Sequence, residues 1–466
     1  MTMPDAVAST APEPCDLLVR ARAAFVMDAD GTVLSDVALA VRAGRIAAIG
    51  PADEMARRFA PARTLGSAHH LLLPGLVNTH NHTPIMVVRG MVEDVGFAPA
   101  YTPGVPQGDM LSEEEAYLLS RLGLYEMLRF GSTTVVDFYR HPEALAKAAQ
   151  EIGLRSFIGG RILDADTAAL ARREWRSDPA QGEATLREAT DFISAWQGRS
   201  PLITPVIGPH APDTCSPALL RQVAQMAEAQ DLIVHTHLHQ SPMEVEIVQA
   251  RDGLRPVELM QEVGLLNRRT IAGHCIHMTE ADIARFGAAG AAVAHIPVGN
   301  AAHGSVAPIR ALEQAGARIT LATDTKSGDM FAAMHMALAG TRIRGAGFAV
   351  KSHDVMRWAT VGGASALGIA HEVSTLREGS KADLVLLDGR APNLAPLIDG
   401  PGLIVHSAQG GNVDAVVVNG TVLLERGRPT TFDGDDVVAA AQAVARRLWE
   451  RAGHTPRIAD AVAHAH

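Results

Sequence analysis

The sequence is poor in cysteine, in aromatic residues and in lysine, and it contains no long apolar run. Its three cysteines, Cys15, Cys215 and Cys275, are odd in number and far apart, which fits a reducing cytoplasm and no disulfide framework. Aromatic residues make up 4% of the chain and the net charge is −10, which argues against a nucleic-acid partner. No apolar run reaches the length of a transmembrane helix, and the N-terminus lacks the pattern of a signal peptide. We therefore expect a cytoplasmic protein with no membrane partner.

The middle of the chain alternates between strand-like and helix-like segments. Hydrophobic residues make up 47% of the 466, enough for a large core. Eight strands are expected: the apolar run before His80, then 133–137, 156–159, 202–207, 232–237, 270–274, 292–295 and 318–324. Helix-like stretches such as 112–129, 142–151 and 217–230 separate them. This count predicts an α/β fold, a (β/α)8 TIM barrel over 74–370, with its active site at the carboxyl ends of the strands.

Short β-like runs bracket this barrel on both sides. They are expected in 15–73, where no helix of useful length fits, and again in 371–430. The economical explanation is one small β-sandwich domain formed from both flanks. Residues 1–14 are predicted to be a flexible tail, and 431–466 a C-terminal helix followed by a tail.

Two histidines follow the apolar run that begins at residue 71. His80 and His82 are spaced i, i+2, so a strand would place both imidazoles on one face. Alone, such a pair is as compatible with a polar loop as with a metal site. Three more potential ligands, His237, His274 and Asp324, close other predicted strands of the same barrel. Together these strand ends predict the centre of a metal-dependent hydrolase.

Five segments resemble successive signatures of the amidohydrolase superfamily. They are 74–82, 235–240, 273–277, 295–300 and 322–324. The closest branch holds the cytosine, guanine and S-adenosylhomocysteine deaminases and the s-triazine and phenylurea hydrolases. The flanking segments 45–50 and 378–384 also resemble the β-sandwich parts of that family. The resemblance runs from about residue 15 to residue 428 and implies an enzyme that hydrolyses carbon–nitrogen bonds other than peptide bonds.

The resemblance also implies roles for individual residues. His80, His82, His237 and Asp324 match the metal ligands, and Asp324 would also take the proton of the attacking water. His274 would polarise the substrate or hydrogen-bond the tetrahedral intermediate. His210 matches a substrate-contacting histidine. Arg161, which ends a predicted strand, is expected to be either a substrate contact or part of a salt bridge at the barrel rim.

The scarcity of lysine bears on the number of metal ions. Binuclear members of the superfamily bridge two ions with a carboxylated lysine at the end of the fourth strand. Only four lysines occur in this chain, and none lies between Lys147 and Lys326, the interval that holds the fourth predicted strand. One divalent ion is therefore expected, zinc first, with iron, cobalt or manganese as alternatives.

Position 240 departs from the pattern of the deaminases. There a glutamate three residues after the fifth-strand histidine carries a proton to the ring nitrogen, but here the residue is Gln240. An amide cannot carry a titrating proton. Glu244 and Glu246 follow, and both are expected on the next helix, facing solvent. Gln240 is therefore expected to bind substrate without moving protons.

Two enzymatic hypotheses follow from this departure. The first is a mononuclear hydrolase that cleaves the C–N or C–S bond of a small, rather apolar amide, urea, carbamate or thiocarbamate. The second is an aminohydrolase, deaminase or dechlorinase-like, acting on a heteroaromatic ring such as a nucleobase, pterin or s-triazine. The loop 92–103, with Met86 and Met91, suggests an apolar pocket and favours the first. A third, non-catalytic hypothesis keeps the barrel as a binding protein without metal. The expected partners are a small-molecule substrate and further copies of the chain in a homo-oligomer.

Overall fold

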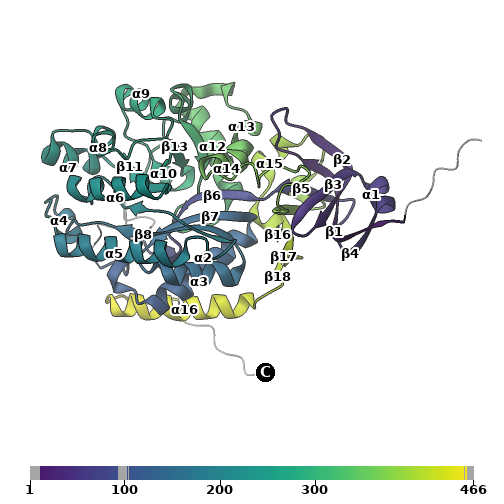
Figure 1. The fold of residues 1–466 in the computed structure, drawn as a ribbon, viewed down its shortest axis with the longest axis horizontal. Helices are drawn as coiled ribbons and strands as arrows, with labels where there is room; N and C mark the ends of the chain where they lie inside the picture. The colour runs from purple at the N-terminus through teal and green to yellow at the C-terminus, as the bar shows by residue number, and fades with distance from the viewer. Residues whose placement is uncertain (1–10, 93–101, 103, 456, 459–466) are drawn as a thin grey trace, which may run out of the picture.

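Strands and helices alternate through the middle of the chain, and a β-rich part is built from both of its flanks (Figure 1). The computed structural model describes residues 11–92, 102, 104–455 and 457–458. Most of the loop 93–103 and most residues of the predicted tails lie outside this description. No described helix is long and apolar enough to cross a membrane.

Strands from both flanks share one nine-stranded sheet. They are β1 (Glu13–Phe25), β2 (Val33–Arg42), β3 (Arg45–Pro51), β4 (Phe59–Gly66), β5 (His70–Pro74), β15 (Leu384–Asp388), β16 (Val413–Val418), β17 (Thr421–Glu425) and β18 (Arg428–Pro429). The order is β18-β17-β16-β15-β5-β1-β2-β3, and β4 pairs with β1. β5 runs antiparallel to β15, so Leu72 lies opposite Leu386 from the other flank. The two ends of the sequence are thus joined by backbone hydrogen bonds.

Two details of this region differ from the expectation. β1 begins at Glu13, inside the segment predicted to be a tail. A two-turn helix, α1 (Ala52–Arg58), lies where no helix was expected. Acidic residues in its first turn and basic residues in its last turn complement the helix dipole, and Met55 anchors it in the core. A helix of seven residues is too short to show a clear periodic pattern of apolar residues in the sequence.

The middle of the chain forms parallel sheets, which confirms the α/β assignment. The strands are β6 (Leu76–Asn81), β7 (Ser132–Tyr139), β8 (Arg155–Ile162), β9 (Ile203–Pro205), β10 (Gly208–Pro209), β11 (Val234–Leu238), β12 (Thr270–His274), β13 (Ala292–His295) and β14 (Arg318–Leu321). One sheet has the order β10-β8-β7-β6, with β9 beside β8, and the other the order β11-β12-β13-β14. The recorded strand pairs do not close these sheets into one barrel. At one junction a parallel bridge joins Ile207 to Val234, and at the other Asp324 N–H donates to His80 O at 3.0 Å.

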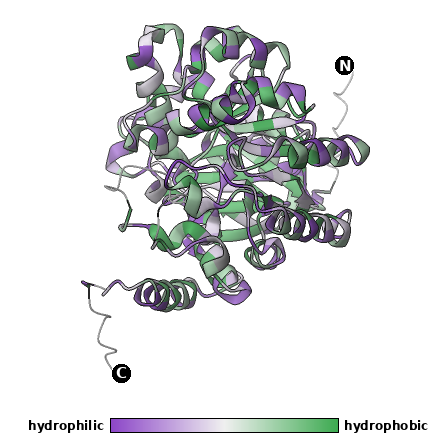
Figure 2. Cartoon of the chain, turned by 90° about the vertical axis from the view of Figure 1, so that its left-hand side faces the viewer, coloured by the Kyte–Doolittle hydropathy of each residue, from purple (hydrophilic) through white to green (hydrophobic). Residues whose placement is uncertain are grey.

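Helices surround these strands. The helices between β6 and the end of the parallel strands are α2 (Glu113–Arg129), α3 (Pro142–Ile152), α4 (Thr167–Leu170), α5 (Pro179–Trp196), α6 (Pro217–Ala229), α7 (Pro242–Asp252), α8 (Pro256–Glu262), α9 (Glu280–Ala288), α10 (Pro297–Ala302) and α11 (Ile309–Gln314). They are followed by α12 (Met330–Thr341), α13 (Ser352–Arg357), α14 (Gly363–Ala366), α15 (Pro401–Ser407) and α16 (Gly434–Arg451). Figure 2 shows mainly green strands at the centre and many purple segments on the helices around them.

The strands are buried on both faces, which explains their continuous apolar runs. Every residue of β7 is buried. Val136 packs inward with Ile271 and Ala294, whereas its neighbour Val135 joins the large cluster formed with the helices. Alternate residues of the strand therefore pack in two separate layers, one enclosed by the strands and one between the strands and the helices. The inner layer leaves the carboxyl ends of the strands for polar side chains.

Candidate active site

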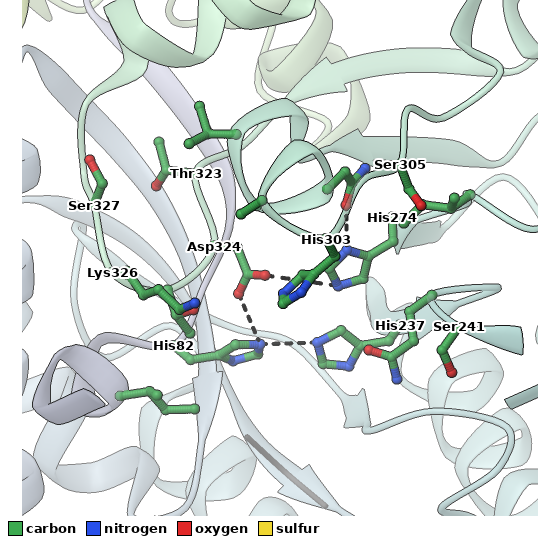
Figure 3. A pocket seen from close by; sticks show the side chains of 18 of the residues that line it. His82, His237, Ser241, His274, His303, Ser305, Thr323, Asp324, Lys326 and Ser327 are labelled. Atoms are coloured by element: carbon green, nitrogen blue, oxygen red, sulfur yellow. Dashed lines mark hydrogen bonds and ion pairs between the residues drawn. The ribbon is translucent and has the colours of Figure 1, made fainter. Parts of the chain in front are cut away.

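Polar side chains from four strands converge at the carboxyl ends of the parallel sheets (Figure 3). His80 lies in β6 and His82 directly follows that strand, whereas His237 lies in β11. His274 is the last residue of β12, and Asp324 lies three residues beyond β14. The structure thus brings together the five residues that the sequence assigned to a metal centre.

The tautomers of His82 and His237 are set by backbone carbonyl groups. Nδ1 of His82 lies 2.8 Å from Phe138 O, and Nδ1 of His237 lies 2.7 Å from His210 O. A carbonyl oxygen only accepts, so each Nδ1 carries the hydrogen and each Nε2 of the neutral ring carries a lone pair. These two Nε2 atoms face one another at 3.0 Å. Two lone pairs at this distance repel unless a cation lies between them, which is the arrangement of histidines that ligate a metal.

His80 and Asp324 complete this donor set. His80 is fully buried, and neither of its ring nitrogens has a hydrogen-bond partner among the described residues. Asp324 Oδ1 lies 3.8 Å from Nε2 of both His80 and His82. One donor atom from each of His80, His82 and Asp324 lies within 4.8 Å of the others, and the same holds for His80, His237 and His274. Three imidazoles and one carboxylate are a donor set that divalent transition metals accept.

Burial keeps these imidazoles neutral. It lowers the pKa of His82, and it lowers the pKa of His80 and of His237 well below 6.5. The neighbouring histidines act in the same direction, because a second positive charge would be repelled. A neutral imidazole is the form that binds a metal, so burial favours the form of these rings that can act as ligands.

His274 is held by a side chain that the sequence did not assign. Its Nδ1 donates to Asn300 Oδ1 at 2.9 Å, and its Nε2 lies 3.9 Å from Asp324 Oδ2. Asn300 lies in the segment 295–300 that resembles the family, but its partner cannot be read from the spacing. His274 and Asp324 both have positive φ, at 72° and 63°. Such backbone strain in residues other than glycine is typical of functional sites.

A cavity of about 470 Å³ opens over this cluster. His210 and Gln240 line it, as predicted, together with His82, His237, His274 and Asp324. His210 Nδ1 lies 2.8 Å from Thr214 Oγ1, which orients the ring. Lining residues that sequence reasoning missed include Tyr139, Ser241 and Lys326. Tyr139 ends β7, and Ser241 and Lys326 lie beyond β11 and β14. They form no motif in the sequence, so only the fold brings them together.

Arg161 also lines the cavity, and it forms no ion pair with any described residue. Its guanidinium lies 4.8 Å from the centre of the Tyr139 ring, and its Nε has no partner in the described part of the chain. The rim salt bridge that was one of the two expectations for Arg161 is therefore not seen there. A contact with substrate is the remaining expectation.

The expectation for Glu244 was wrong. Glu246 is 58% exposed, as expected, but Glu244 is fully buried under the turn that carries Gln240. Its carboxylate accepts the peptide N–H groups of His239 at 2.8 Å and of Gln240 at 2.7 Å. Burial and the charge of Asp213 raise the pKa of Glu244 to about 8. Glu244 is absent from the described lining of the cavity, so it does not replace the missing glutamate at position 240.

The apolar pocket expected from the loop 92–103 is not supported by its methionines. Met86 is buried in the core, and Met91 is 43% exposed. Neither is among the described residues that line the cavity. Most of the loop itself, 93–101 and residue 103, lies outside the described residues. Met86 and Met91 therefore give no support to an apolar substrate.

Acid should destabilise the fold through buried histidines that have no role at the cavity. Burial lowers the pKa of His295 from 6.5 to about 3, and neither of its nitrogens has a described partner. Between these values the unfolded chain binds a proton that the folded chain excludes, so stability is present above pH 6.5 and is lost as pH falls. His295→Leu should reduce the slope of unfolding free energy against pH by about 1.4 kcal/mol per unit below pH 6. Urea unfolding between pH 7 and pH 5 measures it.

The control for this experiment is His371→Leu, because His371 is exposed. It should leave the pH slope of the wild type unchanged. An equal acid-induced loss in His295→Leu and in the wild type would contradict the assignment of that slope to His295.

Comparison with known proteins identifies the family. The model of the amidohydrolase family matches residues 71–423, and that of a bacterial imidazolonepropionase-like composite domain matches 38–62. A 5-methylthioadenosine/S-adenosylhomocysteine deaminase of Moorella thermoacetica is 34% identical over 421 residues, covering 89% of this chain and 96% of the relative.

Solved structures agree with this match. An adenosine deaminase of Xanthomonas campestris with bound zinc has a TM-score of 0.85 at 30% identity, covering 94% of this chain and 99% of its own. An atrazine chlorohydrolase of Arthrobacter aurescens with zinc has a TM-score of 0.79 at 22% identity, covering 92% and 100%, and shares the fold. The resemblance predicted from the five motifs is thus confirmed. The chain belongs to the amidohydrolase family and is a hydrolase that acts on carbon–nitrogen bonds.

Proposed function

We propose that the protein is a mononuclear metal-dependent aminohydrolase that removes an amino group from a heteroaromatic ring. The observation that carries the metal dependence is the pair of Nε2 lone pairs of His82 and His237, which face one another at 3.0 Å beside Asp324. The ring substrate is supported by relatives named as deaminases of adenine nucleosides. Of the two enzymatic hypotheses from the sequence, these relatives favour the second.

The fold proposed for this site is a closed barrel of eight parallel strands with an appended β domain. The bridge from Ile207 to Val234 supports closure at one junction of the two sheets, and the hydrogen bond from Asp324 N–H to His80 O supports it at the other. Closure would place all four contributing strand ends on one face, where barrel enzymes have their active sites.

His80, His82, His237 and Asp324 would hold one divalent ion, with zinc as the first candidate. Lys326 is the only lysine among the described residues that line the cavity, and it follows β14 rather than the fourth strand. No carboxylated-lysine bridge to a second ion is therefore expected. When bound, such an ion acidifies a water molecule and supplies the nucleophile near neutral pH.

Side chains of this protein accept and donate the protons that the reaction transfers. Asp324 takes one proton from the attacking water as the new carbon–oxygen bond forms. His274 Nε2, on the far side of Asp324, is placed to exchange that proton with Asp324 and to hydrogen-bond the tetrahedral carbon's substituents. The proton then passes to the departing amino group, the electron pair that the attack moved onto the ring nitrogen re-forms the ring C=N bond, and the bond to the amino group breaks to release ammonia. Gln240 and His210 orient the ring by hydrogen bonds but add no proton carrier at position 240.

A second candidate function is favoured by Gln240 itself. Hydrolysis of an amide, urea or carbamate carbonyl needs no protonation of a ring nitrogen, so an amide at position 240 would suffice there. The two candidates differ in their product: ammonia from a ring, or an amine from an open-chain carbonyl compound.

A metal-controlled substrate screen tests this function. The protein, loaded with zinc after dialysis, should release ammonia from at least one of 5-methylthioadenosine, guanine, pterin or an amino-s-triazine. Chelator treatment should remove about one ion per chain and abolish the activity, and zinc should restore it. Amine released only from arylureas or carbamates would move the assignment to the second candidate. Bound metal without hydrolysis of either class would contradict both.

A further inference from the structure

The turn between β11 and α7 lines the cavity with three consecutive residues. Gln240, Ser241 and Pro242 all face the site, and His239 just before them has a positive φ of 52°. For a residue with a side chain this conformation is unfavourable, so it persists only where the surroundings impose it. Some contact must therefore hold the chain in this sharp turn.

Glu244 supplies that contact. Its two carboxylate oxygens accept two successive peptide N–H groups, Oε1 from His239 at 2.8 Å and Oε2 from Gln240 at 2.7 Å. The side chain is fully buried, so water does not compete for these bonds. Such bonds in a buried place are costly to lose, because a peptide N–H left without its acceptor is not rehydrated. The two hydrogen bonds of Glu244 close a short loop, and residues of this loop line the cavity.

An ordinary capping role does not account for this carboxylate. Ser241 already caps α7, because its Oγ accepts the N–H of Glu244 at 3.1 Å. The two donors that Glu244 binds precede the helix and belong to the turn. Burial of this carboxylate beside Asp213 is costly, as its raised pKa shows. Because Ser241 already caps α7, capping does not explain why this carboxylate is buried there.

The same turn is tied to the loop that follows β12. His239 O accepts the N–H groups of Ile276 and His277, each at 3.0 Å, and Leu238 O accepts the N–H of Cys275 at 2.9 Å. Ile276 and His277 line the cavity beside His274. The loop after β12 is thus held against the turn by backbone hydrogen bonds that do not involve Glu244.

We infer that Glu244 is a positioning residue, whose carboxylate clamps the turn after β11 so that the Gln240 amide is aimed at the substrate. The inference rests on the proposed function in naming a substrate, but the clamp itself is a property of the fold. Glu244 acts through Gln240 and does not touch the reacting atoms.

The first measurement needs no substrate. In Glu244→Gln one oxygen is replaced by an NH2 group, which cannot accept a peptide N–H. Amide hydrogen exchange of a peptide spanning residues 238–242 should become at least about 10-fold faster than in the wild type, since a buried hydrogen bond is lost. Unchanged exchange would overturn the clamp whether or not the proposed function holds.

The second measurement is a double-mutant cycle on kcat and KM, run with whichever substrate the wild-type protein hydrolyses. Glu244→Gln and Gln240→Ala should each lower kcat/KM by about 10- to 100-fold. The double variant should be no worse than Gln240→Ala alone, because Glu244 has nothing left to aim. Losses that multiply in the double variant would show a merely structural role and overturn the inference.

Glu258→Gln is the matched control. Glu258 Oε2 accepts the peptide N–H of Arg255 at 3.0 Å at the start of α8, and Glu258 is not among the described residues that line the cavity. This variant loses a carboxylate–backbone bond of the same kind. It should lower the melting temperature as much as Glu244→Gln or less, and it should leave kcat/KM within about twofold. A comparable loss of activity in Glu258→Gln would assign the effect of Glu244→Gln to general destabilisation.

Discussion

Asp324→Asn is expected to lower kcat/KM by about 10³-fold or more while the chain stays folded. We propose two tasks for Asp324, as a metal ligand and as a proton acceptor. Its Oδ1 lies 3.8 Å from Nε2 of His80 and of His82, and its Oδ2 lies 3.9 Å from His274 Nε2. An amide keeps the size of the side chain but can neither take a proton from water nor neutralise a cation. Steady-state kinetics with the substrate found in the screen measure the loss. Metal analysis of the same sample separates the two tasks.

The control is Asp329→Asn. Asp329 also lines the cavity, but its Oδ1 accepts N–H groups at the start of α12, from Phe331 at 2.9 Å and Ala332 at 3.2 Å. Asparagine caps helices about as well as aspartate, so this variant should fold and keep activity within about threefold. If Asp324→Asn retained more than about a tenth of the wild-type activity with its metal bound, Asp324 would not be the proton acceptor.

The convergence of histidines at the strand ends could be predicted because their signal is local and repeats. Each of His80, His237 and His274 lies at or near the end of an apolar run, and a parallel fold brings such ends to one face. A β domain built from both flanks was also expected from the short β-like runs there, and in the structure the flanks share one sheet in which Leu72 pairs with Leu386. In these cases the pattern along the chain and the tertiary packing call for the same arrangement.

Other features depend on contacts that no spacing reveals. Glu244 lies in the first turn of a helix, where an acidic residue is ordinarily exposed, yet it turns under the chain to reach peptide groups of the preceding turn. Asn300 reaches His274 from another strand–helix unit. The facing lone pairs of His82 and His237 depend on the carbonyl groups behind them. Each is a hydrogen bond between a side chain and a distant or buried backbone or side-chain group, which composition and periodicity do not encode.

The deaminases that this chain resembles have a glutamate where this chain has Gln240, and the difference can be tested by the substitution Gln240→Glu. Gln240 lines the cavity, and Glu244 fixes its peptide group without occupying the cavity wall. A carboxyl at position 240 could carry a proton to a ring nitrogen, a step of general acid catalysis that contributes about 10²- to 10⁴-fold. If the substrate is a heteroaromatic amine, Gln240→Glu should raise kcat for ammonia release by about 10²-fold. It should also add an acidic group to the pH profile of kcat/KM that the wild type lacks.

The isosteric control Gln240→Met separates charge from shape, because methionine fills the same space without an amide or a carboxyl. It should lose activity relative to the wild type, since the ring then has no hydrogen-bond partner at position 240. A loss of ammonia release in Gln240→Glu as large as that in Gln240→Met would mean that the amide itself is required. Gln240 would then be adapted to a substrate whose carbonyl needs no proton from this side, and hydrolysis of a urea or carbamate would become the better assignment.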